Sequence, residues 1–364
     1  MIRALVVDDE APARARLRAL LDEIGGVTVV GEAGDADAAR AAVAALGPDV
    51  VFLDIEMPAE RGTALVATLP EPRPFIVFAT AYERFAIDAF QYDAADYLLK
   101  PVNRQRLQAA LERMRAKLAD RHAAEREVAA AVRAQAHLLP QSLPAAPGYE
   151  LSAQTLAARS VGGDFYDAVP AGDHLAFVLG DVAGKGMAAG LIASSVQARW
   201  QAAMQQRDLT LAGMMAVLNQ DVFRSTEGSR YATLVHGVLT PATGHLRYVN
   251  AGHPPSLVVG SDGSWRLALD ATAPAIGLFD GATFPAGGLE LALGDTLVVM
   301  SDGVTEALDP EGRELDLGSL AAIVAACVRR GADVAAAVVD AVCAHRGTHQ
   351  AQDDVTVLSL RRTA

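Results

Sequence analysis

Roughly the first hundred residues alternate short, continuously apolar runs with amphipathic stretches, and this alternation constrains the fold more than any other feature of the sequence. The apolar runs predict strands at residues 2–7, 27–31, 50–53, 75–79 and 97–99. The stretches between them, such as 11–21 and 36–46, have the spacing of helices. Strands that are apolar on both faces must be covered on both faces, so this region is predicted to be a doubly wound α/β domain with a parallel sheet.

A long helical pattern follows from about Asn103 to Leu143. Its apolar positions repeat every seven residues, and three polar side chains interrupt them. The apolar positions are Leu107, Leu111, Met114, Leu118, Val128, Val132 and Leu139, and the interruptions are Arg121, Glu125 and Gln135. Two interpretations stay open: a helix packed on its own domains, or a parallel coiled coil that makes the protein a homodimer.

Pro140, Pro144, Pro147 and Gly148 end this helix and mark a domain boundary. Beyond them, short β-like runs are expected at 164–169, 174–179, 231–239, 245–249, 296–300 and 355–360. Helical segments are expected at 188–205, 211–223 and 320–345. The sequence therefore predicts a first domain at 1–118, a helical linker at 119–147, and an α+β layered domain with two antiparallel sheets at 148–364.

Composition excludes some classes of protein. The chain has 364 residues and a net charge of −13, which argues against binding to nucleic acid or to an anionic membrane surface. No apolar run approaches the roughly 20 residues that span a bilayer, and the N-terminus does not resemble a signal peptide, so a cytoplasmic location is expected. The two cysteines, Cys327 and Cys343, have no metal-type spacing and are expected to be packing residues.

Five polar residues lie at the ends of the predicted strands of the first domain. These are Asp8, Asp9, Asp54, Thr80 and Lys100. The carboxyl ends of parallel strands meet at one edge of the sheet, where such folds bind their ligands. Three converging carboxylates favour a divalent cation such as Mg²⁺. Asp54 could then attack a phosphoryl donor, with Thr80 and Lys100 binding the phosphoryl oxygens.

On these residues, positions 1 to about 118 resemble a response-regulator receiver domain of the kind usually joined to LytR/AlgR-type output domains. The resemblance implies a flavodoxin-like sheet of order 2-1-3-4-5, phosphorylation of Asp54 by a cognate sensor histidine kinase, and a Mg²⁺ ligand from the backbone of Glu56. It also implies that Thr80 and Tyr97 switch on activation and that a cis-type proline follows Lys100. No basic DNA-binding module follows, so a DNA-binding regulator is set aside.

The second domain places acidic residues beside glycine at predicted strand ends. They are Asp164, Asp181, Asp302 and Asp353. A turn at Pro170–Asp173 predicts a hairpin that sets Asp164 opposite Leu179 or Gly180, and hence beside or diagonal to Asp181. Clustered carboxylates without His or Cys favour Mn²⁺ or Mg²⁺ over Zn²⁺. Two such ions can activate a water molecule for hydrolysis of a phosphate ester.

Residues from about 150 onward resemble the SpoIIE/RsbU-like branch of the metal-dependent (PPM-type) protein phosphatases. The motifs that carry the resemblance are Val-Gly-Gly-Asp-Phe-Tyr-Asp at 161–167, Gly-Asp-Val-Ala-Gly-Lys-Gly at 180–186, Arg-Tyr-Ala-Thr-Leu at 230–234, Asn-Ala-Gly-His-Pro-Pro at 250–255, Ser-Asp-Gly-Val-Thr-Glu-Ala at 301–307 and Asp-Asp-Val-Thr at 353–356.

The resemblance implies the following roles. Asp181 bridges two metal ions, with the Val182 carbonyl on one of them. Asp164 serves the second ion, whereas Asp302 and Asp353 serve the first. The outer-shell residues are Asp167 and Asp354. The roles of His253, Lys185 and Arg159 stay open, although the 250–255 run is expected to shape a loop near the site.

Together these features predict a response regulator whose output is the dephosphorylation of a phosphoserine or phosphothreonine protein. The family resemblance implies a STAS-type anti-sigma-factor antagonist as substrate. The alternative is a non-catalytic adaptor whose phosphatase-like domain only binds a partner; loss of metal carboxylates would distinguish it, and all four are present. The sequence leaves open whether phosphorylation of Asp54 activates or inhibits.

Overall fold

The computed structural model describes residues 1–58, 60–70, 73–81, 94–158, 161–205, 210–349 and 351–364. The chain divides into two compact units, residues 1–126 and 127–364, and each is described by itself. No helix among these residues carries an apolar stretch long enough to cross a membrane. The predicted domain and linker bounds (1–118, 119–147 and 148–364) stay a prediction.

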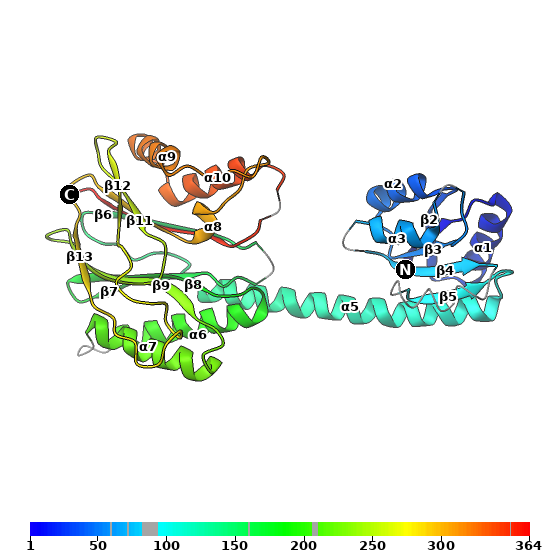
Figure 1. The fold of residues 1–364 in the computed structure, drawn as a ribbon, viewed down its shortest axis with the longest axis horizontal. Helices are drawn as coiled ribbons and strands as arrows, with labels where there is room; N and C mark the ends of the chain where they lie inside the picture. The colour runs from blue at the N-terminus through cyan, green and yellow to red at the C-terminus, as the bar shows by residue number, and fades with distance from the viewer. Residues whose placement is uncertain (59, 71–72, 82–93, 159–160, 206–209, 350) are drawn as a thin grey trace. The chain divides into compact units, whose positions relative to one another are not determined.

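The first unit contains a five-stranded parallel sheet of order β2-β1-β3-β4-β5, which confirms the predicted fold (Figure 1). Its strands are β1 (Ile2–Val7), β2 (Val27–Ala33), β3 (Val50–Leu53), β4 (Phe75–Thr80) and β5 (Asp96–Leu99). Its helices include α1 (Ala11–Ile24), α2 (Ala36–Leu46), α3 (Gly62–Thr68) and the first part of α5 (Arg104–Leu138). The sheet is covered on both faces, as its continuously apolar strands require.

Helix α5 contributes its first apolar positions to the core of this unit. Leu107, Leu111 and Met114 are fully buried, and they pack with Leu17 and Leu21 of α1. These side chains cannot also form the seam of a coiled coil. Later in the helix, Val128 and Val132 are only half-buried. The coiled-coil hypothesis therefore rests on the second half of the seven-residue repeat.

The second unit is built from two antiparallel five-stranded sheets, as predicted. One sheet has the order β13-β10-β9-β8-β7, with β7 (Phe165–Ala171), β8 (His174–Val182), β9 (Ala232–Thr240), β10 (His245–Ala251) and β13 (Gly287–Glu290). The other has the order β12-β11-β14-β15-β6, with β6 (Tyr149–Leu156), β11 (Ser256–Val259), β12 (Trp265–Ala268), β14 (Thr296–Met300) and β15 (Val355–Arg362).

Helices cover the outer face of each sheet (Figure 1). Helices α6 (Met187–Met204) and α7 (Leu211–Thr226) pack on the first sheet around Trp200, which is fully buried. Helices α9 (Leu317–Arg330) and α10 (Val334–Arg346) pack on the second. Residues from the inner faces, such as Phe177 and Leu358, form a third core between the sheets. This is the layered arrangement in which each sheet buries both faces.

One predicted helix was wrong. Residues 320–345 form not one helical segment but parts of α9 and α10, because Gly331 ends α9 in the left-handed conformation at φ 62°. Asp333 then caps α10 by accepting a hydrogen bond from the Ala336 amide at 3.0 Å. The sequence reasoning also missed β6, β11, β12, β13 and the short helix α8 (Asp302–Thr305).

Candidate functional site

The strand ends of the first unit bring three carboxylates together. Asp8 and Asp9 follow β1, and Asp54 follows β3, the strand that pairs directly with β1. One oxygen from each of the three lies within 4.8 Å of the other two. Asp8 and Asp54 are buried, whereas Asp9 is exposed. This geometry suits a divalent cation that keeps several water ligands.

Lys100, at the end of β5, supplies a positive charge inside this pocket. Its Nζ atom lies 2.5 Å from Asp54 Oδ2 and 2.6 Å from Asp8 Oδ2. Burial raises the pKa of Asp54, and the Lys100 ammonium only partly offsets this effect. Burial works against the charged Lys100, but hydrogen bonds to Asp54 and Asp8 outweigh it and raise its pKa. The Lys100–Pro101 peptide bond is cis.

Thr80, at the end of β4, completes the polar strand ends. Its hydroxyl is fully buried and has no hydrogen-bond partner among the described residues. A buried hydroxyl without a partner is costly, so a ligand oxygen placed here would satisfy it. The Thr80 carbonyl accepts a hydrogen bond from the Lys100 amide at 2.8 Å, which fixes the two residues side by side. Tyr97 is half-buried against the core that contains Phe78.

The backbone after Asp54 also faces the pocket. The Glu56 amide donates to Asp54 Oδ1 at 3.2 Å. Asp54 is in turn held at the strand end, because its own amide donates to the Val7 carbonyl at 2.9 Å. The assignment of the Glu56 backbone as a metal ligand stays a prediction.

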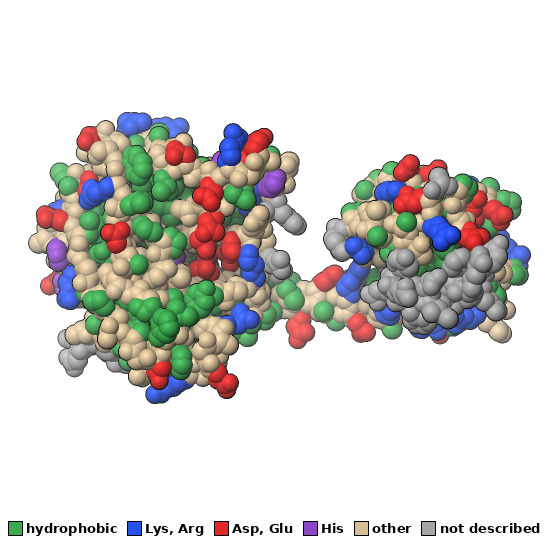
Figure 2. All heavy atoms as spheres, viewed as in Figure 1, with side chains coloured by type: hydrophobic (Ala, Val, Ile, Leu, Met, Phe, Trp, Pro, Cys, Tyr) green, Lys and Arg blue, Asp and Glu red, His purple; other side chains and the backbone are tan. Residues whose placement is uncertain are grey.

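In the second unit, four carboxylates come from the ends of strands in both sheets. Asp164 precedes β7, Asp181 lies near the end of β8, Asp302 follows β14 and Asp353 shortly precedes β15. Figure 2 shows acidic side chains gathered on one face of this unit. Because β7 pairs with β8, and β14 with β15, the four carboxylates form two neighbouring pairs.

The predicted register of the first hairpin was wrong by one or two residues. Phe165 pairs with Gly180 and Tyr166 with Leu179, so Asp164 lies level with Asp181 itself. The turn at Gly172 connects the two strands where it was expected. In the observed register, the carboxylates of Asp164 and Asp181 lie directly across the hairpin from each other, closer than the sequence indicated.

Burial and mutual repulsion perturb these carboxylates. Burial and the Asp181 charge raise the pKa of Asp164 well above its usual value, and the buried Asp164 Oδ2 has no hydrogen-bond partner within the described ranges. Burial, followed by the charges of Asp302 and Asp353, raises the pKa of Asp181 to about 6. Burial and Asp353 likewise raise the pKa of Asp302. Such a set cannot be fully ionised without added positive charge, so it fits divalent cations.

The carboxylates of the second unit are less closely gathered than those of the first unit. Over the described part of the chain, only Asp8, Asp9 and Asp54 bring three ligand atoms within 4.8 Å of one another. Glycine nevertheless allows close packing of the backbone here. A side chain on Gly163 would lie 2.8 Å from the Val182 carbonyl and 2.9 Å from Asp181 Oδ1, and one on Gly303 would collide with the Asp354 carbonyl.

Two acidic residues expected in the outer shell have different surroundings. Asp354 accepts hydrogen bonds from the amides of Ala158 and Gly163, both at 2.8 Å, and so holds the residue before Asp164. Asp167 pairs with Val178, whose side chain faces the α6 core, and its carboxylate accepts from Gln197 and Gln201 of α6. By strand alternation Asp167 thus lies on the face of the sheet opposite Asp181. Both outer-shell roles stay predictions.

The 250–255 run connects the two sheets beside the carboxylates. His253 is buried, and its ring bonds the Thr233 hydroxyl at 3.0 Å and the Met300 carbonyl at 3.1 Å. Thr233 is the register partner of Asp181, and Met300 is two residues before Asp302. Burial lowers the pKa of His253 to about 4, so the ring is neutral at pH 7. It links the backbone segments that carry two of the carboxylates.

Lys185 lies at the edge of this site. Its Nζ atom is 3.0 Å from Asp353 Oδ2 and also donates to the Gln352 carbonyl. Arg159 lies outside the described residues. The sequence reasoning missed three side chains, Gln135, Arg346 and His349, which contact or lie next to this site. For Gln135 a signal was present, because a glutamine interrupts the apolar repeat of the linker; the other two carried none.

The fold and the two carboxylate sites define a class of protein: a receiver domain followed by a phosphatase domain with two antiparallel sheets flanked by helices. Family models agree. The model of the response regulator receiver domain matches residues 4–112, and that of stage II sporulation protein E (SpoIIE) matches residues 171–363, more than half of the chain. The chain belongs to the SpoIIE family, and it is a receiver domain fused to a SpoIIE/RsbU-like phosphatase domain.

Individual relatives cover one domain each. The transcriptional regulatory protein BtsR of Escherichia coli K12 is 49% identical over 116 residues, which cover 32% of this chain and 48% of BtsR. The chain therefore spans about half of the length of the curated relatives it matches. The crystal structure of the RsbU and RsbW domains of Rv1364c from Mycobacterium tuberculosis is 29% identical, has a TM-score of 0.51, and aligns with 62% of this chain and 63% of that one.

A third comparison concerns the fold alone. The SiaA-PP2C domain of Pseudomonas aeruginosa has a TM-score of 0.57 at 20% identity, over 67% of this chain and 98% of that domain.

Proposed function

We propose that this chain is a response regulator whose output is the metal-dependent dephosphorylation of phosphoserine or phosphothreonine in a protein. The observation that carries the proposal is the group formed by Asp164, Asp181, Asp302 and Asp353. All four are present at paired strand ends, and like charges raise the pKa of three of them. Hydrolysis of a phosphate monoester is a reaction that such a cluster is suited to support once cations are bound.

In the receiver domain, Asp54 is the proposed phosphoryl acceptor and a sensor histidine kinase the proposed donor. Asp8, Asp9, Asp54 and the Glu56 backbone would hold Mg²⁺, which would offset the carboxylate charge. The Asp54 carboxylate attacks phosphorus, and the donor leaves with its bonding electrons. The Lys100 ammonium and the unpartnered Thr80 hydroxyl then bind the phosphoryl oxygens. Rearrangement of Thr80 and Tyr97 would follow.

In the phosphatase domain, two Mn²⁺ or Mg²⁺ ions would be held as the family resemblance implies. Asp181 would serve both ions and the Val182 carbonyl one of them, while Asp302 and Asp353 would serve the first ion and Asp164 the second. Bound there, the ions would lower the pKa of a water molecule and neutralise phosphate charge. His253 keeps the Asp181 and Asp302 segments at a fixed spacing through its two hydrogen bonds. Asp354 holds the Gly163 amide, and with it the start of β7.

The proposed substrate is a phosphorylated STAS-type anti-sigma-factor antagonist, and the support for it is membership of the SpoIIE family. The proposed location is cytoplasmic. A non-catalytic adaptor would need no metal carboxylates, and their retention here disfavours it.

Control of the phosphatase by the receiver is proposed to act through helix α5. Formation of a homodimer through the same helix is part of this proposal. Near the end of this helix, the Gln135 side-chain amide binds both backbone polar groups of one residue: Nε2 donates to the Gly162 carbonyl at 2.7 Å, and Oε1 accepts from the Gly162 amide at 3.3 Å. Gln197 of α6 donates to the Leu138 carbonyl at 2.9 Å. The end of α5 thus holds the loop that leads into Asp164.

The test uses the full chain with Mn²⁺ and a phosphorylated antagonist or phosphothreonine peptide, with and without beryllium fluoride as a phosphoryl mimic at Asp54. We expect phosphate release above that of an Asp302→Ala variant, and a rate that changes when the mimic is added. The direction of the change gives the sign of control. Release no faster than from Asp302→Ala in either state would overturn the proposed activity.

A further inference from the structure

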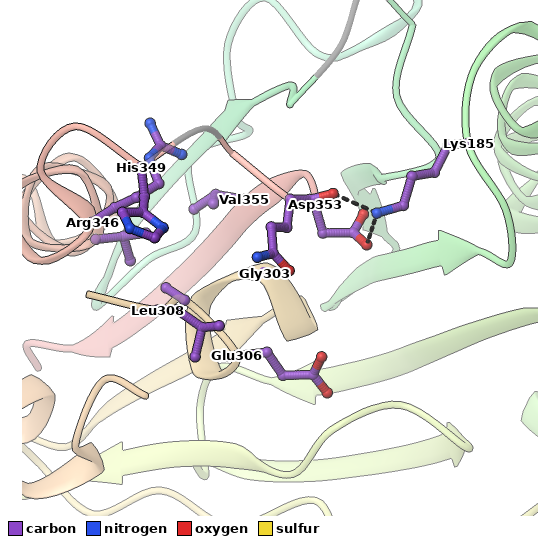
Figure 3. A pocket seen from close by; sticks show the side chains of 11 residues that line it. Lys185, Gly303, Glu306, Leu308, Arg346, His349, Asp353 and Val355 are labelled. Atoms are coloured by element: carbon purple, nitrogen blue, oxygen red, sulfur yellow. Dashed lines mark hydrogen bonds and ion pairs between the residues drawn. The ribbon is translucent and has the colours of Figure 1, made fainter. Parts of the chain in front are cut away.

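A cavity of about 260 Å³ adjoins the carboxylates of the phosphatase domain. Asp353 and Gly303, the residue after Asp302, form part of its wall. Arg346 and His349, from the end of α10 and the segment after it, line one side, and Lys185 lines another (Figure 3). Asp353 lies between these two groups of basic side chains. The cavity therefore adjoins the proposed metal site, and its lining is mixed in charge: Asp353 and Glu306 are acidic, while Arg346 and His349 lie apart from Glu306 and make one side basic.

Arg346 brings a permanent positive charge to this cavity, and its surroundings explain that charge only in part. It ends α10, where a cation is favoured by the helix dipole. That effect does not satisfy its buried Nε donor, to which no other residue that the structure describes offers a hydrogen-bond acceptor. Within the described part of the chain no carboxylate lies within ion-pair distance of its guanidinium. Lys185, by contrast, is paired with Asp353. A guanidinium that has no carboxylate partner among the described residues can pair with a carboxylate of another molecule that enters the cavity.

The remaining walls indicate what that partner is. Val342, Ala307 and Leu308 make part of the lining apolar, which suits the short aliphatic stem of an Asp or Glu side chain. The volume is about nine times the roughly 30 Å³ share of one liquid water, enough for one side chain but not for a folded segment. A planar guanidinium matches a carboxylate through two parallel hydrogen bonds.

We propose that this cavity binds an acidic side chain of the substrate protein that flanks the phosphorylated serine or threonine, with Arg346 as its ion-pair partner. The inference rests on the proposed phosphatase activity and adds a determinant of substrate choice to it. The carboxylates would hold the ions that bind the phosphoryl group, while the basic side of the cavity contacts a neighbouring residue of the substrate. A neutral or basic residue at that place in the substrate leaves Arg346 unpaired and is disfavoured.

The experiment compares matched phosphothreonine peptides that differ only by Glu or Gln at one flanking position, each position being tested in turn with the full chain and Mn²⁺. At one position we expect kcat/KM to be about tenfold higher for the Glu peptide, the size of effect expected of a charge-assisted pair. Arg346→Ala is expected to bring this ratio close to one. Arg346→Glu is expected to reverse the preference, so that a third peptide with Lys at the same position becomes a better substrate than the Glu peptide. Arg330→Ala, at the equivalent end of α9, is the matched control and should keep the wild-type ratio.

Each outcome is decisive. If the wild type hydrolyses neither the peptides nor p-nitrophenyl phosphate, the proposed function itself fails. If the wild type hydrolyses them with a ratio of one at every position, or Arg346→Ala retains the preference, the activity stands and the acidic subsite is wrong. Equal losses on Glu and Gln peptides in a normally folded Arg346→Ala would assign Arg346 to the phosphoryl group or to the fold, and would also overturn the inference. The inverted ratio of Arg346→Glu cannot result from misfolding.

Discussion

The molecule contains two clusters of aspartates at strand ends, and they balance their charge in different ways. In the receiver, Lys100 lies inside the cluster and contacts both Asp8 and Asp54. In the phosphatase domain, Lys185 lies at the edge and pairs with Asp353 alone, while burial and the Asp181 charge raise the pKa of Asp164. The receiver pocket thus carries its own counter-charge, whereas the phosphatase cluster depends on cations from solution.

The difference fits the proposed chemistry of each site. An acceptor aspartate must stay ionised in a pocket that first holds and then releases a phosphoryl group, and an internal ammonium supports both states. A water-activating centre gains most from divalent charge placed where the nucleophile forms, so its carboxylates are better left free of internal cations. Four predictions test this contrast, and they are ordered by the size of the expected effect.

The largest effect is expected for Asp181→Asn. Loss of the carboxylate that is proposed to bridge two ions should lower Mn²⁺-dependent kcat by more than about a hundredfold, because removal of even outer-shell partners costs 10–100-fold. The same change removes charge repulsion, so without metal the variant should melt no lower than wild type. Asp173→Asn, exposed at the turn of the same hairpin, is the control. Activity near the wild-type level would contradict the assignment of Asp181 to the metal site.

The second prediction concerns pH in EDTA. Folding raises the pKa of Asp181 from about 3.8 to about 6, so its protonated form stabilises the fold below pH 3.8, and this stabilisation is lost as the pH rises through 6. The loss amounts to at most about 3 kcal/mol. The melting temperature should therefore fall by roughly 6–12 °C.

Tryptophan fluorescence measures this transition selectively, because both tryptophans, Trp200 and Trp265, lie in the phosphatase domain. Mn²⁺ should abolish the fall, since bound cations stabilise the ionised carboxylates. A melting temperature that is flat or rises between pH 4 and 7 in EDTA would contradict the account of this cluster.

Lys100→Met tests the other side of the comparison. The substitution leaves two buried carboxylates without their counter-charge and should destabilise the receiver by about 2 kcal/mol. This is less than the roughly 3–5 kcal/mol expected when one partner of a fully buried ion pair is removed, because the side chain of Lys100 is 19% exposed. Urea unfolding by circular dichroism measures the change, and Mg²⁺ should restore part of it. Lys117→Met, exposed on α5, should change stability by less than about 0.5 kcal/mol. Equal effects of the two variants would show that Lys100 does not stabilise the receiver by offsetting the charge of the buried carboxylates.

The smallest effect is expected for Gln135→Leu. Losing two hydrogen bonds to Gly162 should cost about 1 kcal/mol of phosphatase stability. More informatively, it should reduce the ratio of phosphatase rates measured with and without the phosphoryl mimic at Asp54. Gln141→Leu, exposed beyond the end of α5, should leave that ratio unchanged. An unaltered ratio in Gln135→Leu would exclude this contact as a route of control.

Much of the fold was predictable, because periodicity reports burial directly. The continuous apolar strands of the receiver predicted a sheet covered on both faces, and the structure has one. The two sheets of the phosphatase domain were also expected. The break between α9 and α10 was missed because Gly331 and Asp333 are weak signals within an Ala- and Val-rich stretch. Short edge strands such as β12 and β13 were missed because four residues are too few to show a clear periodicity.

In the candidate sites too, some residues were predictable from the sequence and others were not. Strand-end carboxylates could be found by pattern, since parallel or paired strands bring their ends together whatever the details of packing. Gln135 and His253 could not be assigned contacts, because each meets its partners across elements far apart in the chain. The place of Arg346 in the cavity beside the carboxylates likewise depends on packing. The register of the 165–182 hairpin also depended on packing, and the one-residue difference moved Asp164 level with Asp181.

By itself the sequence determined the two domain classes and the identity of the carboxylates, because local periodicity and motif spacing encode them, and the resemblance to receiver domains implied the order of the receiver strands. Only the tertiary structure decided that Lys100 lies between two carboxylates while Lys185 stays at the rim, and that Arg346 lies beside the carboxylates with no ion-pair partner among the described residues. Charge balance depends on distances of a few ångströms between residues far apart in the chain, and only packing of the folded elements sets those distances.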